Sequence, residues 1–298
     1  MKRILVTGAN GMTGSEVCAQ AAAAGWTVRA LSHADADITD AGALRAAANI
    51  FHPHVVVNCA AYTAVDRAES EPELAMAVNG VGAANVARAA AAVGAPIVHV
   101  STDYVFNGRG TTPYSPEDRT DPINSYGKSK LAGEIGVRAE NSKSVIVRTS
   151  WVFSHRGPNF VRTMLRLGSE RDELKIVEDQ TGRPTSATDL ASALFTVAHA
   201  IPEKPTLAGT YHFANSGETS WFGFAQAIFE EARMLGETRI PKISAIKTSE
   251  YPTAASRPAY SVLDTSGFTA AFGVNPRSWR SALRDTIALS LRNAPART

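Results

Sequence analysis

The sequence predicts an α/β protein with a doubly wound parallel sheet and a second, smaller α/β domain that binds substrate. Three observations lead to this fold class. Four segments of the first half are apolar along their whole length, which is typical of parallel strands covered by helices on both faces. Helical segments separate these strands, and a glycine-rich turn directly follows the first one. The four segments are RILVT (3–7), HVVVN (54–58), IVHVS (97–101) and SVIVRT (144–149).

Strand and helix alternate through the first half of the chain, which is the order that builds a parallel sheet. Alanine-rich runs favour helix in the intervening segments. We therefore expect residues 1–149 to form a dinucleotide-binding domain. The expected strands are 3–7, 28–31, 54–58, 97–101 and 144–149, and the expected helices are 12–24, 40–51, 73–93 and 124–139.

The alternation weakens after about residue 150. We expect residues 150–298 to form mainly the substrate domain, interleaved with the first, because no Pro/Gly/Ser-rich linker separates the halves. Some of these later segments are expected to return to the first sheet. The expected helices are 157–169, 188–199, 220–235 and 279–292, and the expected strands are 174–177, 210–213 and 243–246.

Composition excludes several classes of function. The 298 residues carry a net charge of only +2, which implies neither nucleic acid nor an anionic membrane as a partner. Two cysteines, Cys18 and Cys59, cannot build a disulfide framework or a structural zinc site. The opening MKRILVTG is too short an apolar run for a signal peptide, and no window is long enough to span a membrane. We expect a cytoplasmic protein.

The glycine-rich turn TGANGMTG places Gly8, Gly11 and Gly14 between the first strand and the first helix. Glycines at such a turn let backbone N–H groups and the positive helix end approach a pyrophosphate. The spacing is GxxGxxG rather than the commoner GxGxxG, and a tight turn without a ligand is the alternative. Because βα units follow, we expect a Rossmann-type site for NADPH or NADH.

The end of the second strand bears on the choice of cofactor. Ser32 and His33 stand where an acidic residue often holds the adenosine ribose. The absence of an acid there permits a 2′-phosphate and favours NADPH. Asp35 is close and no arginine follows, so NADH stays open. Further along the loop, Asp37 and Ile38 could flank the adenine.

The stretch INSYGKSKLAGE (123–134) places Tyr126 four residues before Lys130. On a helix capped by Asn124 or Ser125, these two side chains share one face. A phenol titrates near pH ~10, and an adjacent ammonium lowers its pKa. The pair is therefore expected to donate or accept a proton near neutral pH. The alternative is a surface tyrosine with a solvated lysine.

Further stretches carry a resemblance. NCAAYTAVDRAE (58–69) and VSTDYVFNG (100–108), taken with the glycine turn and Tyr126–Lys130, are similar to the extended short-chain dehydrogenase/reductase superfamily. STDYVF, YGKSKLAGE, RTSWVF, DQTGRPT and YPTAASRP together resemble the dTDP-4-dehydrorhamnose reductase family across nearly the whole chain. The resemblance implies NAD(P)H-dependent reduction of the 4-keto group of dTDP-4-dehydro-L-rhamnose to dTDP-L-rhamnose.

The resemblance also implies roles for individual residues. Tyr126 is expected to be the general acid, with Lys130 lowering its pKa and binding the cofactor ribose, and Thr102 is expected to stabilise the carbonyl oxygen. Arg257 is expected to grip a diphosphate. The expected cofactor-binding residues are Gly8, Asn10, Gly11, Met12, Thr13, Gly14, Ser32, His33, Asp37, Ile38, Ala60, Ala61, Tyr62, Thr63, Val100, Tyr126 and Lys130. The expected substrate-binding residues are Thr102, Asp103, Tyr104, Trp151, Asn159 and Arg257.

Each substrate-side residue also has a structural alternative. Thr102 and Asp103 could satisfy a strand end or cap a turn, Tyr104 and Trp151 could be core aromatics, and Arg257 could be a surface arginine.

The resemblance raises two further questions, whether the protein binds a metal and whether it forms a dimer. Some members of the family are said to bridge a dimer through glutamates and magnesium. Glu16 fits that pattern, but Thr188 stands where a second acid is expected, and the histidines show no metal spacing. We expect no metal, and a homodimer remains open.

Three other functions compete. The chain could be a ketoreductase for another nucleotide-linked 4-keto-6-deoxyhexose. It could be a nucleotide-sugar epimerase or dehydratase, which recycles its bound cofactor. It could also be a non-catalytic subunit like the regulatory subunit of methionine adenosyltransferase, which shares this fold and binds a partner.

Overall fold

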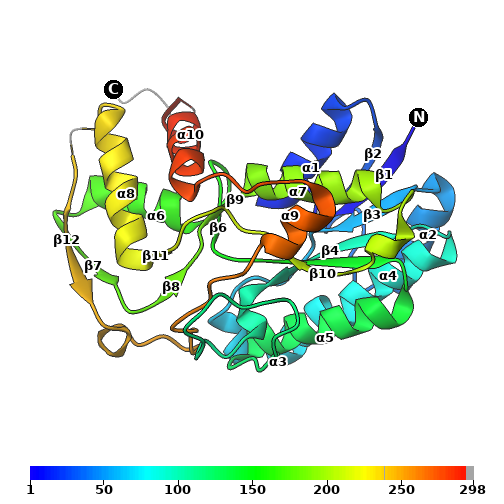
Figure 1. The fold of residues 1–298 in the computed structure, drawn as a ribbon, viewed down its shortest axis with the longest axis horizontal. Coiled ribbons are helices and arrows are strands. Elements are labelled where there is room, and N and C mark those ends of the chain that lie inside the picture. The colour runs from blue at the N-terminus through cyan, green and yellow to red at the C-terminus, as the bar shows by residue number, and fades with distance from the viewer. Residues whose placement is uncertain (238, 293–298) are drawn as a thin grey trace.

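A computed structural model describes residues 1–237 and 239–292 of the chain. Its largest sheet has the strand order β10-β5-β4-β3-β1-β2 (Figure 1). Every pair of neighbouring strands in this order is parallel. The strands are β1 (Arg3–Thr7), β2 (Thr27–Leu31), β3 (Val55–Asn58), β4 (Ile97–Thr102), β5 (Ser144–Thr149) and β10 (Gly209–His212).

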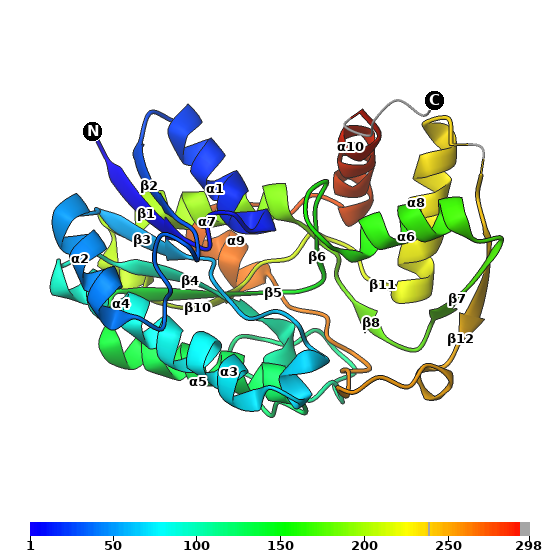
Figure 2. The ribbon, with the colours of Figure 1, turned by 180° about the vertical axis from the view of Figure 1, so that it is seen from behind.

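Helices cover both faces of this sheet, as Figures 1 and 2 show. One face carries α1 (Met12–Ala23), α7 (Ala187–Ala200) and α9 (Ser266–Phe272). The other face carries α2 (Ala41–Phe51), α4 (Ala83–Ala92) and α5 (Ser125–Glu140).

The strand residues divide between two buried cores. Ile4 and Val6 of β1 point into one core, whereas Leu5 points into the other. All three are at most 3% exposed. A strand buried on both faces needs an unbroken apolar run. The predicted doubly wound α/β fold is confirmed.

The order of the strands reverses beside β1, because β2 lies on one side of it and β3 on the other. In open α/β sheets, ligands bind outside the carboxyl ends of the strands at such a reversal. The loops after β1 and β3 therefore define where a bound dinucleotide is expected.

The second half of the chain contributes to both parts of the molecule. β10 pairs with β5, α7 packs against α1, and α9 packs against β10, so these segments return to the first sheet. The remaining segments form a lobe beside the sheet (Figure 2). This lobe contains α6 (Phe160–Glu170), α8 (Trp221–Met234), α10 (Trp279–Arg292), β7 (Glu173–Val177) paired with β12 (Lys242–Ile246), β8 (Thr181–Gly182) paired with β11 (Thr219–Ser220), and β6 (Val152–Phe153) paired with β9 (Thr185–Ser186). A domain boundary near residue 150 stays a prediction.

The helix expected at 73–93 is not continuous. It consists of α3 (Pro72–Met76), the π-helical turn η2 (Ala77–Gly82) and α4. The wider π turn carries Asn79, whose amide bonds the backbone of Tyr62. The π turn buries Asn79, Gly80 and Gly82 and leaves Val81 exposed, so it carries no apolar stripe that would set it apart within an alanine-rich helical segment.

Several short elements were not expected from the sequence. Two-residue strands show no periodicity, and α9 has only seven residues. The short helical turns are η1 (Arg67–Glu69), η3 (Asp103–Val105), η4 (Pro205–Leu207) and η5 (Thr248–Glu250). No helix in the described part of the chain is long and apolar enough to cross a bilayer.

Candidate active site

The glycine turn after β1 forms a closely packed cradle. Gly8 has φ +67°, and a Cβ there would lie 2.5 Å from the backbone nitrogen of Ala60. A Cβ at Gly14 would meet the carbonyl of Gly8, which accepts a 3.0 Å hydrogen bond from the N–H of Gly11. Gly11 in turn is the N-cap of α1 and makes no side-chain cap. Because no side chain covers these backbone N–H groups, the helix N-terminus can accommodate a pyrophosphate group.

Met12 and Thr13 begin α1, and Asn10 is exposed in the turn before it. The sulfur of Met12 lies 3.7 Å from the amide nitrogen of Asn159. One predicted substrate residue therefore lies beside the predicted pyrophosphate loop, although the two are far apart in the sequence.

The loop after β2 holds the predicted adenosine contacts. Ser32 donates to the carboxylate of Asp35, and His33 is exposed. Asp37 accepts from the N–H and hydroxyl of Thr39 at 2.8 and 2.9 Å. Ile38 is only 5% exposed and packs on Gly82 of η2. The side chain of Ile38 therefore also belongs to the core.

The segment after β3 is held by Asn79, a residue that the sequence analysis missed. Its Oδ1 accepts from the N–H of Tyr62 at 2.8 Å, and its Nδ2 donates to the Tyr62 carbonyl at 2.9 Å. Nδ2 also donates to Ser129 Oγ at 2.9 Å, and Ser129 Oγ donates to the carbonyl of Tyr126. This buried amide thus joins the segment Ala60–Thr63 to the first turns of α5. The available signal was an asparagine within an otherwise apolar helix.

Tyr126 lies in the first turn of α5. Asn124 is the N-cap, and its Oδ1 accepts from the N–H of Gly127 at 2.7 Å. The carboxylate of Glu69 accepts from the N–H of Ser125 at 2.8 Å. Since an N-terminal carboxylate also suits the helix dipole, two side chains set the start of this helix.

Thr102 ends β4, where it pairs in register with Thr149 of β5. Its hydroxyl donates to Asp103 Oδ1 at 3.0 Å and accepts from the N–H of Tyr104 at 3.2 Å. Asp103 is 1% exposed. Burial raises the pKa of Asp103 to about 6, although the nearby hydroxyls of Ser261 and Thr102 oppose the rise.

The effect of Lys130 on the pKa of Tyr126 stays a prediction, because burial dominates this pKa in the structure. Tyr126 is partly exposed, yet burial of its phenol raises the pKa of Tyr126 to about 12. Interaction with the Thr102 hydroxyl lowers this pKa, and the charge of Asp103 raises it further. Loss of water outweighs the favourable contact. At neutral pH the phenol keeps its proton, which is the form that a proton donor requires.

Lys130 is itself buried, with 2% of its surface exposed. Its Nζ donates to the carbonyl of Val100 at 2.7 Å. Burial lowers the pKa of Lys130 to about 8, although Glu134 and Cys59 favour its charged form. The predicted cofactor residues Val100 and Lys130 are therefore in direct contact at the end of β4.

Aromatic side chains extend the site towards the second lobe. The ring of Tyr104 packs edge-on against Tyr126, with centroids 5.5 Å apart. Trp151, two residues beyond the end of β5, has φ +47°. Its indole stacks on Trp221 at 3.6 Å and lies over Gly182, where any Cβ would collide with it. A strained backbone held by packing is typical of functional sites. Trp221 was not anticipated, because a tryptophan beginning a helix has no distinctive spacing.

The remaining predicted substrate residues are already engaged within the protein. Asn159 caps α6, and its amide donates to the Ser154 carbonyl at 2.8 Å. Arg257 makes a two-bond ion pair with Asp66 at 3.0 and 2.7 Å. Asp66 belongs to the stretch 58–69, but its partner Arg257 is 191 residues away in the sequence. The substrate contacts of Asn159 and Arg257 stay predictions.

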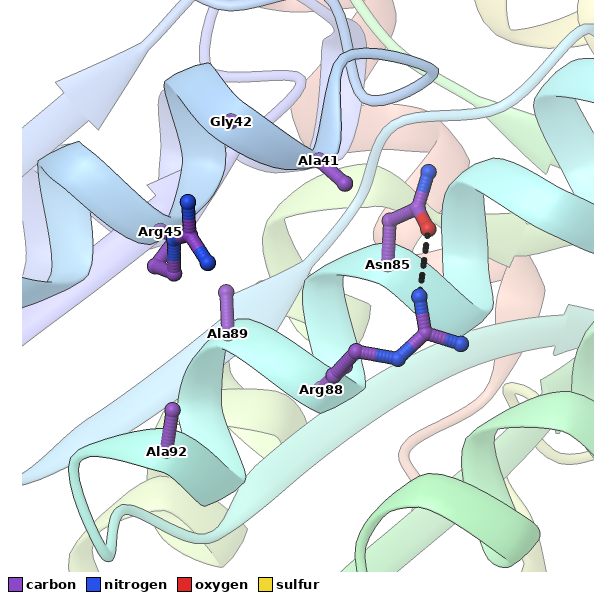
Figure 3. A pocket seen from close by; sticks show the side chains of 7 residues that line it. All are labelled: Ala41, Gly42, Arg45, Asn85, Arg88, Ala89 and Ala92. Atoms are coloured by element: carbon purple, nitrogen blue, oxygen red, sulfur yellow. Dashed lines mark hydrogen bonds between the residues drawn. The ribbon is translucent and has the colours of Figure 1, made fainter.

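A pocket of about 250 Å³ lies between α2 and α4 (Figure 3). In Figure 3, Asn85 points towards Arg88, whose guanidinium donates to it at 3.3 Å. None of the predicted site residues lines this pocket, so we do not assign it to the active site. Its lining residues are Ala41, Gly42, Arg45, Asn85, Arg88, Ala89 and Ala92.

Among residues 1–237 and 239–292, no group of three or more His, Cys, Asp or Glu side chains is placed to hold a metal ion. The expectation of a site without metal stays a prediction.

Fold and site together define a dinucleotide-binding protein of the extended short-chain dehydrogenase/reductase class. The family model described as RmlD substrate binding domain matches residues 1–291. A dTDP-4-dehydrorhamnose reductase from Sinorhizobium fredii is 43% identical, with 96% of each chain covered. The chain belongs to the dTDP-4-dehydrorhamnose reductase family, and the resemblance found in the sequence is confirmed.

Two other proteins are similar to this chain over nearly its whole length. The spore coat polysaccharide biosynthesis protein SpsK of Bacillus subtilis is 45% identical, covering 96% of this chain and 97% of its own. The crystal structure of dTDP-4-dehydrorhamnose reductase from Bacillus anthracis in complex with NADP is 38% identical with a TM-score of 0.91. That match covers 97% of this chain and 99% of the other.

Proposed function

We propose that this chain reduces the 4-keto group of dTDP-4-dehydro-L-rhamnose with NADPH or NADH, giving dTDP-L-rhamnose. Membership of a family of such reductases supports this activity. The observation that carries the proposal is the meeting of Thr102, Tyr126 and Lys130 at the carboxyl end of β4, near the glycine cradle of Gly8.

Three parts of the chain hold the cofactor in this proposal. The cradle from Gly8 to Gly14 takes the pyrophosphate, and the segment Ala60–Thr63 lines the pocket beside it. Lys130, already aimed at the Val100 carbonyl, holds the ribose hydroxyls. The bound cofactor supplies a hydride to the carbonyl carbon.

Proton delivery is the task of Tyr126. Because the pKa of Tyr126 is raised to about 12, its phenol is protonated at neutral pH. The alkoxide formed by hydride addition is a stronger base than this phenolate, so the proton moves to the sugar oxygen. Thr102 lies beside the phenol and stabilises negative charge on the same oxygen.

The substrate is held on the side of the second lobe. Asp103 and Tyr104 contact the sugar, Trp151 forms an aromatic wall, and Asn159 and Arg257 contact the nucleotide portion. Residues 1–149 mainly bind the dinucleotide and residues 150–298 mainly bind the sugar nucleotide. We further propose that the protein acts in the cytoplasm without a metal, and a homodimer stays open.

The test is to supply the 4-keto dTDP sugar with each cofactor and follow the absorbance of the reduced nicotinamide. Tyr126→Phe is expected to lower kcat by roughly a hundred- to ten-thousand-fold, because it removes only the proton donor. Tyr211→Phe is the matched control, since Tyr211 lies on β10, away from the site, and its phenol donates to the Leu207 carbonyl in η4.

Wild-type kcat in Tyr126→Phe would contradict the assigned acid. Sugar conversion without stoichiometric loss of reduced cofactor would instead indicate an epimerase or dehydratase. A stoichiometric protein partner combined with no turnover would favour the regulatory-subunit alternative. Turnover of a different 4-keto-6-deoxyhexose, but not of this one, would move the assignment to a neighbouring ketoreductase.

A further inference from the structure

The carboxyl end of β2 is the place where a dinucleotide-binding unit meets the adenosine ribose. Here the glycine turn and β2 are joined directly, because the N–H of Ala9 donates to the Leu31 carbonyl at 3.1 Å. Ser32 follows Leu31 at the tip of the strand and carries no charge of its own. The structure nevertheless brings a carboxylate to this tip, from Asp35 in the turn that follows.

Asp35 folds back over the strand end. Its Oδ2 accepts from the backbone N–H of Ser32 at 2.9 Å and from the Ser32 hydroxyl at 2.6 Å. The turn is closed by the N–H of Asp35, which donates to the Ser32 carbonyl at 3.1 Å. Both donors that Ser32 offers are thereby engaged by a negative group. Neither remains free for the 2′-phosphate of NADPH.

The other carboxylate oxygen is differently placed. Within the described residues, Oδ1 of Asp35 has no hydrogen-bond partner, so it can accept from a ribose hydroxyl. Hydrogen bonds from the side chain and backbone of Ser32 lower the pKa of Asp35, and the charge of Arg29 acts in the same direction. Asp35 is therefore ionised at neutral pH.

The charges around Asp35 do not reverse this picture. His33 Nδ1 lies 3.9 Å from Asp37 Oδ2, so this imidazole is beside a second carboxylate. Arg29 lies on β2 and acts on Asp35 through its charge. The carboxylates of Asp35 and Asp37 repel a 2′-phosphate at this place. A ribose hydroxyl can instead donate a hydrogen bond to a carboxylate oxygen.

We propose that Asp35 supplies the ribose-binding carboxylate that Ser32 lacks, and that its charge makes this site select NADH over NADPH. The inference rests on the proposed function, in that it assumes a dinucleotide in the glycine cradle. It reverses the preference for NADPH that Ser32 suggests when the sequence is considered alone.

The experiment compares Asp35→Asn with the wild-type chain. The dissociation constants of NADH and NADPH are measured by titration calorimetry, without any sugar present. Asparagine keeps the shape and one acceptor but removes the charge. The affinity for NADPH relative to NADH is expected to rise about fivefold to tenfold. Repulsion between two partly solvated charges in contact changes a dissociation constant by about this factor.

Asp118→Asn is the matched control. Asp118 makes the same turn, because its Oδ2 accepts from the N–H of Ser115 at 2.8 Å and its own N–H donates to the Ser115 carbonyl at 3.1 Å. This turn lies in the loop between η3 and α5, so the ratio of the two affinities is expected to stay at the wild-type value.

A wild-type preference for NADPH, or an unchanged ratio in Asp35→Asn, would overturn the inference. The function is tested separately by sugar turnover. Dinucleotide binding with the expected shift in ratio, but no turnover of the 4-keto sugar, would refute the function and leave the selectivity standing. Failure of the wild-type chain to bind either dinucleotide would refute both.

Discussion

Lys130 shows how far burial can change the charge state that a residue type would have in water. The sequence suggests an ammonium that acidifies Tyr126, but the protein withdraws water from both groups. Burial lowers the pKa of Lys130 to about 8 and raises the pKa of Tyr126 to about 12. Each shift disfavours the charged form. The pair is therefore less charged than the same residues would be on an exposed helix.

The buried ammonium has a consequence for stability. Between pH 8 and 10.5 the unfolded chain binds a proton at Lys130 that the folded chain has lost. Stability therefore rises with pH across this window. Below it, the folded state carries the full cost of burying the charge, on the order of 3 kcal/mol for a shift of this size.

Lys130→Met should consequently raise the melting temperature at pH 7 and make it less dependent on pH between 8 and 10.5. Melting curves of both proteins across this range check the prediction, and comparing them cancels other titrations. If the melting temperature rose equally with pH in the two proteins, Lys130 would not be the group that causes the pH dependence.

At the scale of elements, α5 is positioned by close contact with η2. A Cβ at Gly133 would collide with the backbone carbonyl of Asn79. The contact brings Asn79 near Ser129 and keeps the first turn of α5 beside the segment that contains Tyr62. The π turn is part of this arrangement, because it presents the amide of Asn79 at the interface.

Gly133→Ala is expected to lower the free energy of unfolding by about 1–3 kcal/mol, since two backbones must separate. Gly267→Ala is the matched control: Gly267 lies in α9, and its Cβ would have nothing within 4 Å. That change should be neutral or stabilising by up to about 1 kcal/mol. Urea unfolding measures both, and equal effects would contradict the close contact.

At the scale of the whole molecule, a buried ion pair joins α5 to β5 and lies next to β4 and β10. Arg148 donates to both carboxylate oxygens of Glu134 at 2.8 Å, and Ser101 of β4 donates at 2.6 Å. Arg148 also lies 3.4 Å from His212 on β10. Burial alone would raise the pKa of Glu134, but Arg148 and Ser101 outweigh it and hold that pKa below its usual value.

Glu134→Gln should lower the free energy of unfolding by roughly 3–5 kcal/mol, because it leaves a buried guanidinium uncompensated. Glu140→Gln is its control on the same helix, where Arg88 makes a two-bond pair at the surface, with the two side chains 57% and 29% exposed. That variant should unfold close to the wild-type midpoint. Similar midpoints for both variants would argue against the importance of the buried pair.

A second connection crosses the molecule near the site. Arg257 and Asp66 join the stretch after β12 to the loop after β3. Beside them, the amide of Asn124 donates to the Ser256 carbonyl at 2.8 Å. The cap of α5 therefore contacts a segment of the second half of the chain. These contacts therefore connect the segment of Arg257 to the start of α5, where Tyr126 lies.

The sequence by itself determined the class of fold, the glycine turn and the spacing of Tyr126 and Lys130. These depend on periodicity and on contacts within a few residues, so a local pattern is sufficient. The break in the helix at 73–93 escaped because a single π turn is too short to leave a signal of its own in the sequence.

Only the tertiary structure decided the charge states of Tyr126 and Lys130, the contacts of Asn79 and the ion pair of Arg257 with Asp66. Lys130 meets Val100 across 30 residues, and Arg257 meets Asp66 across 191. Burial and electrostatics depend on everything that surrounds a group in space, and no spacing along the chain encodes the loss of water from Tyr126.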